Sequence, residues 1–132
     1  MEDRYLFKAK FDDSDRWVKG QLVEVNDAYF IIPNYASKIL AGWFSTSNII
    51  EVKKDTICQC TGLKDKNGKL IWENDVVKIN NSKVNTLITF RDFEIICTIP
   101  NEKYYKHRLE YDTEYEVVGN IFDNPELLES EG

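Results

Sequence analysis

Residues 61–79, Thr-Gly-Leu-Lys-Asp-Lys-Asn-Gly-Lys-Leu-Ile-Trp-Glu-Asn-Asp-Val-Val-Lys-Ile, decide the fold class of this chain. Residues 65–68 are typical of a tight turn, because Asn-Gly accepts the positive φ angles that a type I′ connection requires. Apolar and polar positions then alternate over residues 70–73, as in a half-buried strand. Residues 73–75 redirect the chain into a following apolar strand. The stretch therefore predicts a hairpin that leads into a barrel-type strand. It is informative about the architecture and does not indicate an activity.

The remainder of the chain also has the pattern of short strands separated by turns. β-branched and aromatic residues cluster in short runs, which favours strands over helices. The expected strands cover residues 5–11, 17–25, 28–32, 47–52, 57–61, 84–90, 94–99 and 115–122. Gly119 predicts a bulge or a close backbone contact in the last of these, and Pro125 predicts a short helical turn after it. Residues 36–44 fit either a helical face or a loop with a single turn, because Gly42 weakens a helix.

Length and composition fit one soluble domain. The chain has 132 residues, and its 3 Trp, 7 Tyr and 7 Phe are enough to build an apolar core without disulfides or metal. It has no run of about 18 apolar residues, and its beginning lacks the apolar region of a signal peptide. We expect a cytoplasmic, mainly β protein with minor α content. Its single domain, residues 1–132, is expected to combine a β-rich N-terminal part (1–56) with a small SH3-like barrel and short C-terminal helix (57–132).

The central stretch also resembles a known family. The positions that carry the resemblance are Gln59, residues 61–69, Ile71 and Asp75. Together they are similar to the signature of the YopX protein family, a group of small proteins encoded in phages and prophages of bacteria. The resemblance implies a shape and a phage origin, and no catalytic motif comes with it.

Both ends of the chain agree with this resemblance. Residues 4–8 and 17–20 resemble the family's N-terminal strand pair, and residues 114–128 resemble its C-terminal strand and short last helix. Residues 84–111 are diverged. Asn74 stands where the family usually has Gly, but Asn is the residue that best replaces Gly at positive φ, so we expect the turn to be kept.

The cysteines have two interpretations. Cys58 and Cys60 are two residues apart, so on a strand their side chains share one face. They could form a metal or redox pair, or they could be small buried apolar side chains. A zinc site needs more ligands, and the chain has one histidine, His107. We therefore favour the buried role, and we expect neither a metal nor a cofactor.

The acidic charge of the chain argues against binding to duplex nucleic acid over its whole surface. The formal net charge is −6, and residues 91–132 alone carry 11 acidic and 4 basic side chains. Such a surface repels a phosphate backbone. It keeps the chain soluble, and it also suits contact with a basic protein.

Catalytic motifs are missing from the sequence. Paired carboxylates occur within residues 12–15, 73–75 and 114–116. Glu73 and Asp75 could act as an acid–base or metal-binding pair, but such residues more often bind the backbone of a turn. Nucleophilic catalysis needs a base beside the nucleophile, and neither Gly-x-Ser-x-Gly nor a phosphate-binding glycine loop occurs. We therefore expect that the protein is not an enzyme.

One basic and aromatic segment, residues 103–108, is a candidate for contact with nucleic acid. Its aromatic rings could stack on unpaired bases while its cations neutralise phosphates. The candidate residues are Lys103, Tyr104, Tyr105, Lys106 and Arg108. The simpler alternative is a hairpin loop with a solvated basic tip, whose tyrosines pack on the edge of the barrel.

These observations favour a non-catalytic accessory module of phage or prophage origin. We expect it to act in the host cytoplasm through a protein partner of the phage or of the host, or through self-association. Self-association is credible because a small barrel with exposed edges can pair with a copy of itself. The alternative is a nucleic-acid-associated accessory protein that uses residues 103–108. No membrane contact is expected.

Overall fold

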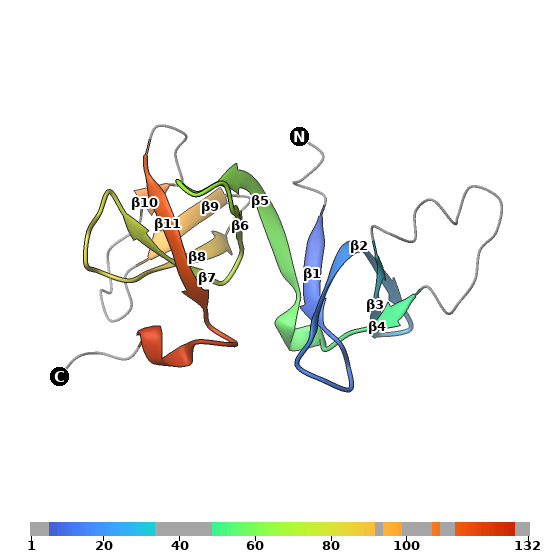
Figure 1. Ribbon diagram of the computed structural model, residues 1–132. Coiled ribbons are helices and arrows are strands. Elements are labelled where there is room, and N and C mark those ends of the chain that lie inside the picture. Colours follow the sequence, from blue (N-terminus) through green and yellow to red (C-terminus); the bar gives the residue numbers. More distant parts are fainter. Residues whose placement is uncertain (1–5, 34–48, 92–93, 99–106, 109–112, 129–132) are drawn as a thin grey trace. The chain divides into compact units, whose positions relative to one another are not determined.

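The computed structural model describes residues 6–33, 49–91, 94–98, 107–108 and 113–128. The chain divides into two compact units, Met1–Cys60 and Thr61–Gly132 (Figure 1). Nearly all secondary structure in these ranges is antiparallel strand, with two short 3₁₀ turns, so the predicted mainly β class is confirmed. The predictions for residues 36–44 lie outside the described residues, and the SH3-like barrel remains a prediction.

The first unit is built on an antiparallel sheet with the strand order β4-β3-β2-β1-β5. The 3₁₀ turn η5 (Lys54–Thr56) precedes β5. The strands are β1 (Phe7–Lys10), β2 (Trp17–Val25), β3 (Ala28–Pro33), β4 (Ile50–Glu51) and β5 (Cys58–Lys64). Strand β5 begins in this unit, where it pairs with β1, and its last residues belong to the second unit.

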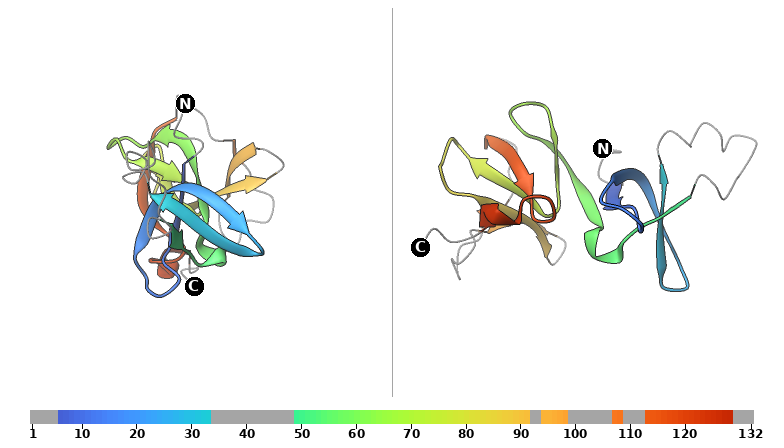
Figure 2. Two further views of the ribbon diagram at one scale, coloured as in Figure 1. Left: turned by 90° about the vertical axis from the view of Figure 1, so that its right-hand side faces the viewer. Right: turned by 60° about the horizontal axis from the view of Figure 1, so that its bottom comes forward.

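The β2–β3 hairpin is the longest strand pair of the first unit (Figure 2). Asn26 and Asp27 have φ angles of 50° and 67°, as the type I′ turn of a two-residue hairpin requires. At the other end of the pair, Gly20 lies opposite Pro33. A Cβ atom at Gly20 would lie 1.9 Å from the carbonyl oxygen of Ile32, so only glycine permits this close approach.

The core of the first unit lies on one face of this sheet. Its buried members are Ala9, Val18, Ile31 and Val52, with Phe7, Phe11, Leu22, Tyr29, Ile50 and Ile57 packed around them. The strand predicted for residues 5–11 is found as β1, in which Phe7 and Ala9 belong to this core and alternate with Lys8 and Lys10 along the sequence. The period of two therefore sets which face of β1 is apolar.

The second unit holds a five-stranded antiparallel sheet with the order β10-β9-β8-β7-β11, and β6 lies beside β5. Its core joins one buried residue from each of five strands and contains Ile71, Val77, Ile88, Cys97 and Tyr115. The elements are β6 (Leu70–Trp72), β7 (Asp75–Ile79), β8 (Thr86–Arg91), β9 (Glu94–Thr98), β10 (His107–Arg108), β11 (Tyr115–Asn120) and the 3₁₀ turn η6 (Pro125–Leu128).

The central hairpin forms where it is predicted, but its turn is not type I′. Gly68 has a φ of 82°, whereas Asn67 is not among the residues with positive φ. The N–H of Gly68 donates to the Asp65 carbonyl at 3.0 Å, and the N–H of Asp65 donates to the Lys69 carbonyl at 2.7 Å. This is a type I turn followed by a left-handed glycine. The Asp65 carboxylate explains the difference, because its Oδ1 accepts the N–H groups of Asn67 and Lys69.

The corner after β6 also depends on a carboxylate. The Oδ2 of Asp75 accepts the N–H of Trp72 at 2.8 Å, and Asn74 between them has a φ of 73°. Both the turn interpretation of residues 73–75 and the expectation that Asn74 replaces glycine are therefore confirmed. The half-buried pattern is wrong, however, because consecutive residues Ile71 and Trp72 are both buried.

Strand β11 carries the predicted bulge. Its register against β7 shifts between Val117 and Gly119. A Cβ atom at Gly119 would lie 2.5 Å from the Oδ1 atom of Asn124, just before η6. That Oδ1 accepts the N–H of Asn120, so the last turn is tied back to the end of the strand. Within the described ranges, no helix has the length and apolar character needed to cross a bilayer.

Candidate functional site

An apolar hollow of about 450 Å³ lies near the tip of the β2–β3 hairpin. It is lined by Val23, Val25, Asn26, Phe30 and Ile49. Val23 lies directly opposite Phe30 in the strand pairing, so their side chains share one face of the ribbon. Leu22 and Ile31, which belong to the core, occupy the other face. Apart from Asn26, the hollow is thus lined by apolar side chains that are not part of the core.

The most exposed apolar residue of this hollow is Val25, which is 51% exposed. It is the last residue of β2 and immediately precedes the type I′ turn. Apart from Val84 in the second unit, no other large apolar residue in the described part of the chain is exposed to this degree. An exposed apolar side chain beside a concave apolar surface is typical of a contact site.

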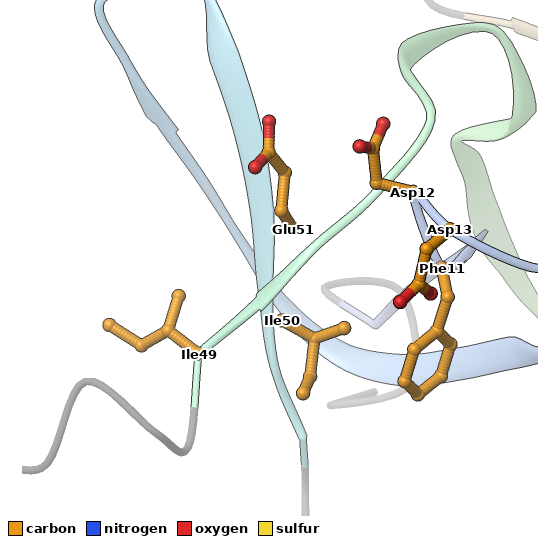
Figure 3. Close-up of a pocket in the computed structure, with 6 residues that line it drawn as sticks. All are labelled: Phe11, Asp12, Asp13, Ile49, Ile50 and Glu51. Carbon is orange, nitrogen blue, oxygen red and sulfur yellow. The ribbon is translucent and has the colours of Figure 1, made fainter.

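A second pocket, of about 380 Å³, shares Ile49 with the first. It is lined by Phe11, Asp12, Asp13, Ile49, Ile50 and Glu51 (Figure 3). Figure 3 shows the carboxylates of Asp12 and Glu51 pointing to the same side, whereas the Asp13 carboxylate lies beside the Phe11 ring. The pocket therefore combines an apolar floor with three acidic side chains.

The backbone fixes the position of these acidic residues. The N–H of Asp12 donates to the Glu51 carbonyl at 3.0 Å, and Phe11 forms a bridge with Val52. These contacts hold the turn after β1 against β4. Asp12, Asp13 and Glu51 are all exposed, and the structure gives them no ion pair with any residue that it describes.

Asp15, in the same turn, has a different environment. It lies 3.8 Å from the Nζ atom of Lys10 and 3.6 Å from that of Lys53. Lys10 in turn lies 5.4 Å from the centre of the Trp17 ring, and Lys8 lies 4.7 Å from it. Cations at this distance from an indole face are attracted to it. The Asp15 carboxylate and the Trp17 ring therefore give Lys8 and Lys10 favourable contacts that offset part of the cost of burying them.

The carboxylate of Asp65 in the second unit is occupied by the backbone. It accepts N–H groups from Asn67 and Lys69 through Oδ1 and from Val117 through Oδ2. Burial alone would raise the pKa of Asp65, but these three N–H groups and the charge of Lys69 outweigh it and hold the pKa below its usual range. A carboxylate so engaged has a structural role.

The three cysteines are buried thiols. The Sγ atom of Cys58 lies 3.2 Å from the carbonyl oxygen of Thr56, to which it donates. Burial raises the pKa of Cys97 to about 12, so its thiol stays protonated at neutral pH. Among the residues that the structure describes, no three His, Cys, Asp or Glu side chains are placed to hold a metal ion.

The predicted nucleic-acid interface lies mostly outside the described residues. Four of its five residues, Lys103, Tyr104, Tyr105 and Lys106, lie outside the described residues. Arg108 lies in β10, where it pairs with Ile96 of β9. Lys66, another cation of the second unit, lies 3.8 Å from the carboxylate of Glu116. Contact of residues 103–108 with nucleic acid stays a prediction.

Sequence reasoning missed the two pockets of the first unit. The available signal was the composition of residues 22–32, in which apolar residues occupy both faces of an otherwise alternating hairpin. A strand with one face in the core needs polar residues on the other, and Val23, Val25 and Phe30 break that rule. Such a surplus of apolar residues on the outer face of the hairpin is typical of a surface that contacts another segment or another protein.

Comparison with known proteins identifies the family. No curated protein matches the chain. A family model described as YopX protein matches residues 6–129, which include almost all of both compact units. The chain belongs to the YopX protein family.

Proposed function

We propose that this chain is a non-catalytic binding module that works through protein contacts. As a protein of phage or prophage origin, it would act in the cytoplasm of a bacterial host, on a partner from the phage or the host, or on a copy of itself. The supporting observation is the apolar hollow at the tip of the β2–β3 hairpin, with Val25 half exposed beside it. Covering such a surface removes apolar area from water, which favours association.

The carboxylates of the central motif also fit a role without catalysis. Asp65 and Asp75 are buried, and each accepts backbone N–H groups of its own turn. A general acid or base must reach a substrate proton, and these side chains serve the backbone instead. Their position is explained by the turns that they stabilise.

Affinity capture with a pair of matched variants tests this function. The tagged protein and its Val25→Ser and Val84→Ser variants are used as bait in extract from a bacterial host. Both substitutions remove an exposed valine, but Val84 lies in the second unit and outside the hollow. We expect the wild type and Val84→Ser to retain the same protein, and Val25→Ser to retain about tenfold less, as expected for losing one buried valine side chain.

Self-association is measured in parallel by light scattering over a range of protein concentrations. A Val25-dependent dimer would support the variant of the proposal in which the partner is a second copy. Equal retention by all three baits would contradict the proposal. The proposal would also be contradicted if the protein stays monomeric at every concentration and captures no other protein.

A further inference from the structure

We infer that the apolar hollow and the carboxylates of Asp12 and Glu51 form one docking surface for a basic segment of a protein partner. An apolar side chain of the segment would enter the hollow, and its Lys or Arg side chains would face the two carboxylates. This inference rests on the proposed function, because it names the chemistry of the partner at the same site.

Strand register places the acidic and apolar parts on the same face. Glu51 of β4 lies directly opposite Phe30 of β3, and Phe30 lies directly opposite Val23 of β2. Residues opposite one another in an antiparallel pair share a face, so Glu51 and the hollow are neighbours across three strands. Ile49, two residues before Glu51, lines both pockets.

Asp12 adds a second carboxylate to this face. Its N–H donates to the carbonyl of Glu51, and its carboxylate points to the same side as that of Glu51 in Figure 3. Neither group forms an ion pair with any described residue, whereas Asp15 in the same turn faces Lys10 and Lys53. Among the described residues, no cation balances the charge beside the hollow, and a cation of a partner could do so.

The same charge argues against the two other kinds of occupant. A second copy that placed this face on itself would bring Asp12 and Glu51 of both chains together, and like charges across an interface cost free energy. The net charge of −6 adds to that repulsion. Nucleic acid would bring phosphates to the carboxylates and would be repelled in the same way. A basic peptide segment with one apolar side chain can fill the hollow and also place cations beside the two carboxylates.

Fluorescence anisotropy with labelled nonapeptides tests the inference on the full chain. The probes carry one Leu, Phe or Met two residues away from a Lys-Arg pair. One control set has Glu-Glu in place of Lys-Arg, and another has Ser in place of the apolar residue. We expect the basic and apolar peptides to bind most tightly, and to bind less tightly as salt is raised from 0.05 to 0.15 M, since salt screens exposed charges.

Two matched variants separate the parts of the surface. We expect Asp12→Asn with Glu51→Gln to weaken binding about tenfold and to flatten the salt dependence. Glu24→Gln with Asp55→Asn removes the same charge from other exposed positions of the first unit and should leave the dissociation constant unchanged. Val25→Ser should weaken binding about tenfold while keeping the salt dependence.

The inference is overturned if no basic and apolar peptide binds, if the Glu-Glu peptides bind equally well, or if both charge variants behave alike. These outcomes differ from failure of the proposed function. A partner that is captured in a Val25-dependent manner, but equally by the Asp12→Asn and Glu51→Gln double variant, would keep the binding module and remove the basic partner.

Discussion

Asp65 accepts a hydrogen bond at 2.9 Å from the N–H of Val117, which lies 52 residues further along the chain. The other oxygen of the same carboxylate accepts two N–H groups of the hairpin turn. One side chain therefore shapes the turn between β5 and β6 and also fixes that turn to β11. Nearby, the N–H of Lys66 donates to the carbonyl of Tyr115, which strengthens the same connection.

Replacing Asp65 with Asn should lower the free energy of unfolding by about 1–3 kcal/mol, because an amide cannot accept all three N–H groups and leaves a buried donor unsatisfied. Urea denaturation at pH 7 measures this loss. Asp13→Asn is the control, since Asp13 is exposed and should change stability by less than about 0.5 kcal/mol. Equal stability of Asp65→Asn and the wild type would show that the carboxylate is dispensable.

The contribution of Asp65 should disappear in acid. Its folded pKa lies below the ordinary value of 3.8, so the stabilisation is fully present above pH 4 or so and is lost as the pH falls through the folded pKa. The difference in unfolding free energy between the wild type and Asp65→Asn should therefore shrink as the pH falls below about 4 and through the lowered pKa of Asp65. A difference that stays constant over this range would contradict the assignment.

Gly68→Val should destabilise the second unit by about 1 kcal/mol or more, because a β-branched residue resists a φ of 82°. A Cβ atom there would meet nothing within 4 Å, so the cost comes from the backbone alone. Gly68→Asn is the matched variant, and it should lose less because Asn tolerates the left-handed conformation. Thermal unfolding compares the two, and an unchanged melting temperature in Gly68→Val would show that the turn relaxes without cost.

Gly20→Ala should strongly destabilise the first unit. Its Cβ would lie 1.9 Å from the backbone oxygen of Ile32, so β2 and β3 must separate locally. We expect a loss of about 2–3 kcal/mol, comparable to overpacking in a core. Thermal unfolding and the dispersion of amide NMR signals measure it. A variant that melts at the wild-type temperature would mean that the strands accommodate the methyl group.

Gly119→Ala should act locally instead. Its Cβ would meet side-chain atoms, Oδ1 of Asn124 at 2.5 Å and Cδ1 of Leu127 at 2.7 Å, and side chains can move away. We expect η6 to detach from β11 while the rest of the unit stays folded. Amide hydrogen exchange should then rise at Asn124 and Leu127, whose N–H groups bond to Asn120 and Asn124. Exchange that rises throughout β7 and β11 would contradict a local effect.

Most strands of the first and last thirds were predictable because each has a strong local signal. Residues 17–25 form β2 with the predicted bounds, and the register shift at Gly119 confirms the bulge. The central turn was predicted at the right place with the wrong type. Asn-Gly alone favours type I′, but the preceding Asp65 binds the next N–H groups and selects type I.

The candidate site depends on relations that a linear pattern does not contain. Val23, Phe30 and Glu51 become neighbours only through the pairing of three strands. Asp12 and Asp15 have the same charge and lie in the same turn, yet among the described residues only Asp15 forms ion pairs with lysines. The contact between β1 and β4 determines which of the two carboxylates forms an ion pair. The composition of the sequence does not contain this information.

The inaccessible sulfur atoms make this chain convenient for site-directed labelling. All three native cysteines are buried, and Cys97, whose pKa burial raises to about 12, has almost no reactive thiolate at neutral pH. A single cysteine introduced at an exposed position would therefore be the preferred target of a maleimide dye. Fluorophores or cross-linkers can be attached beside the β2–β3 tip without first removing the natural thiols.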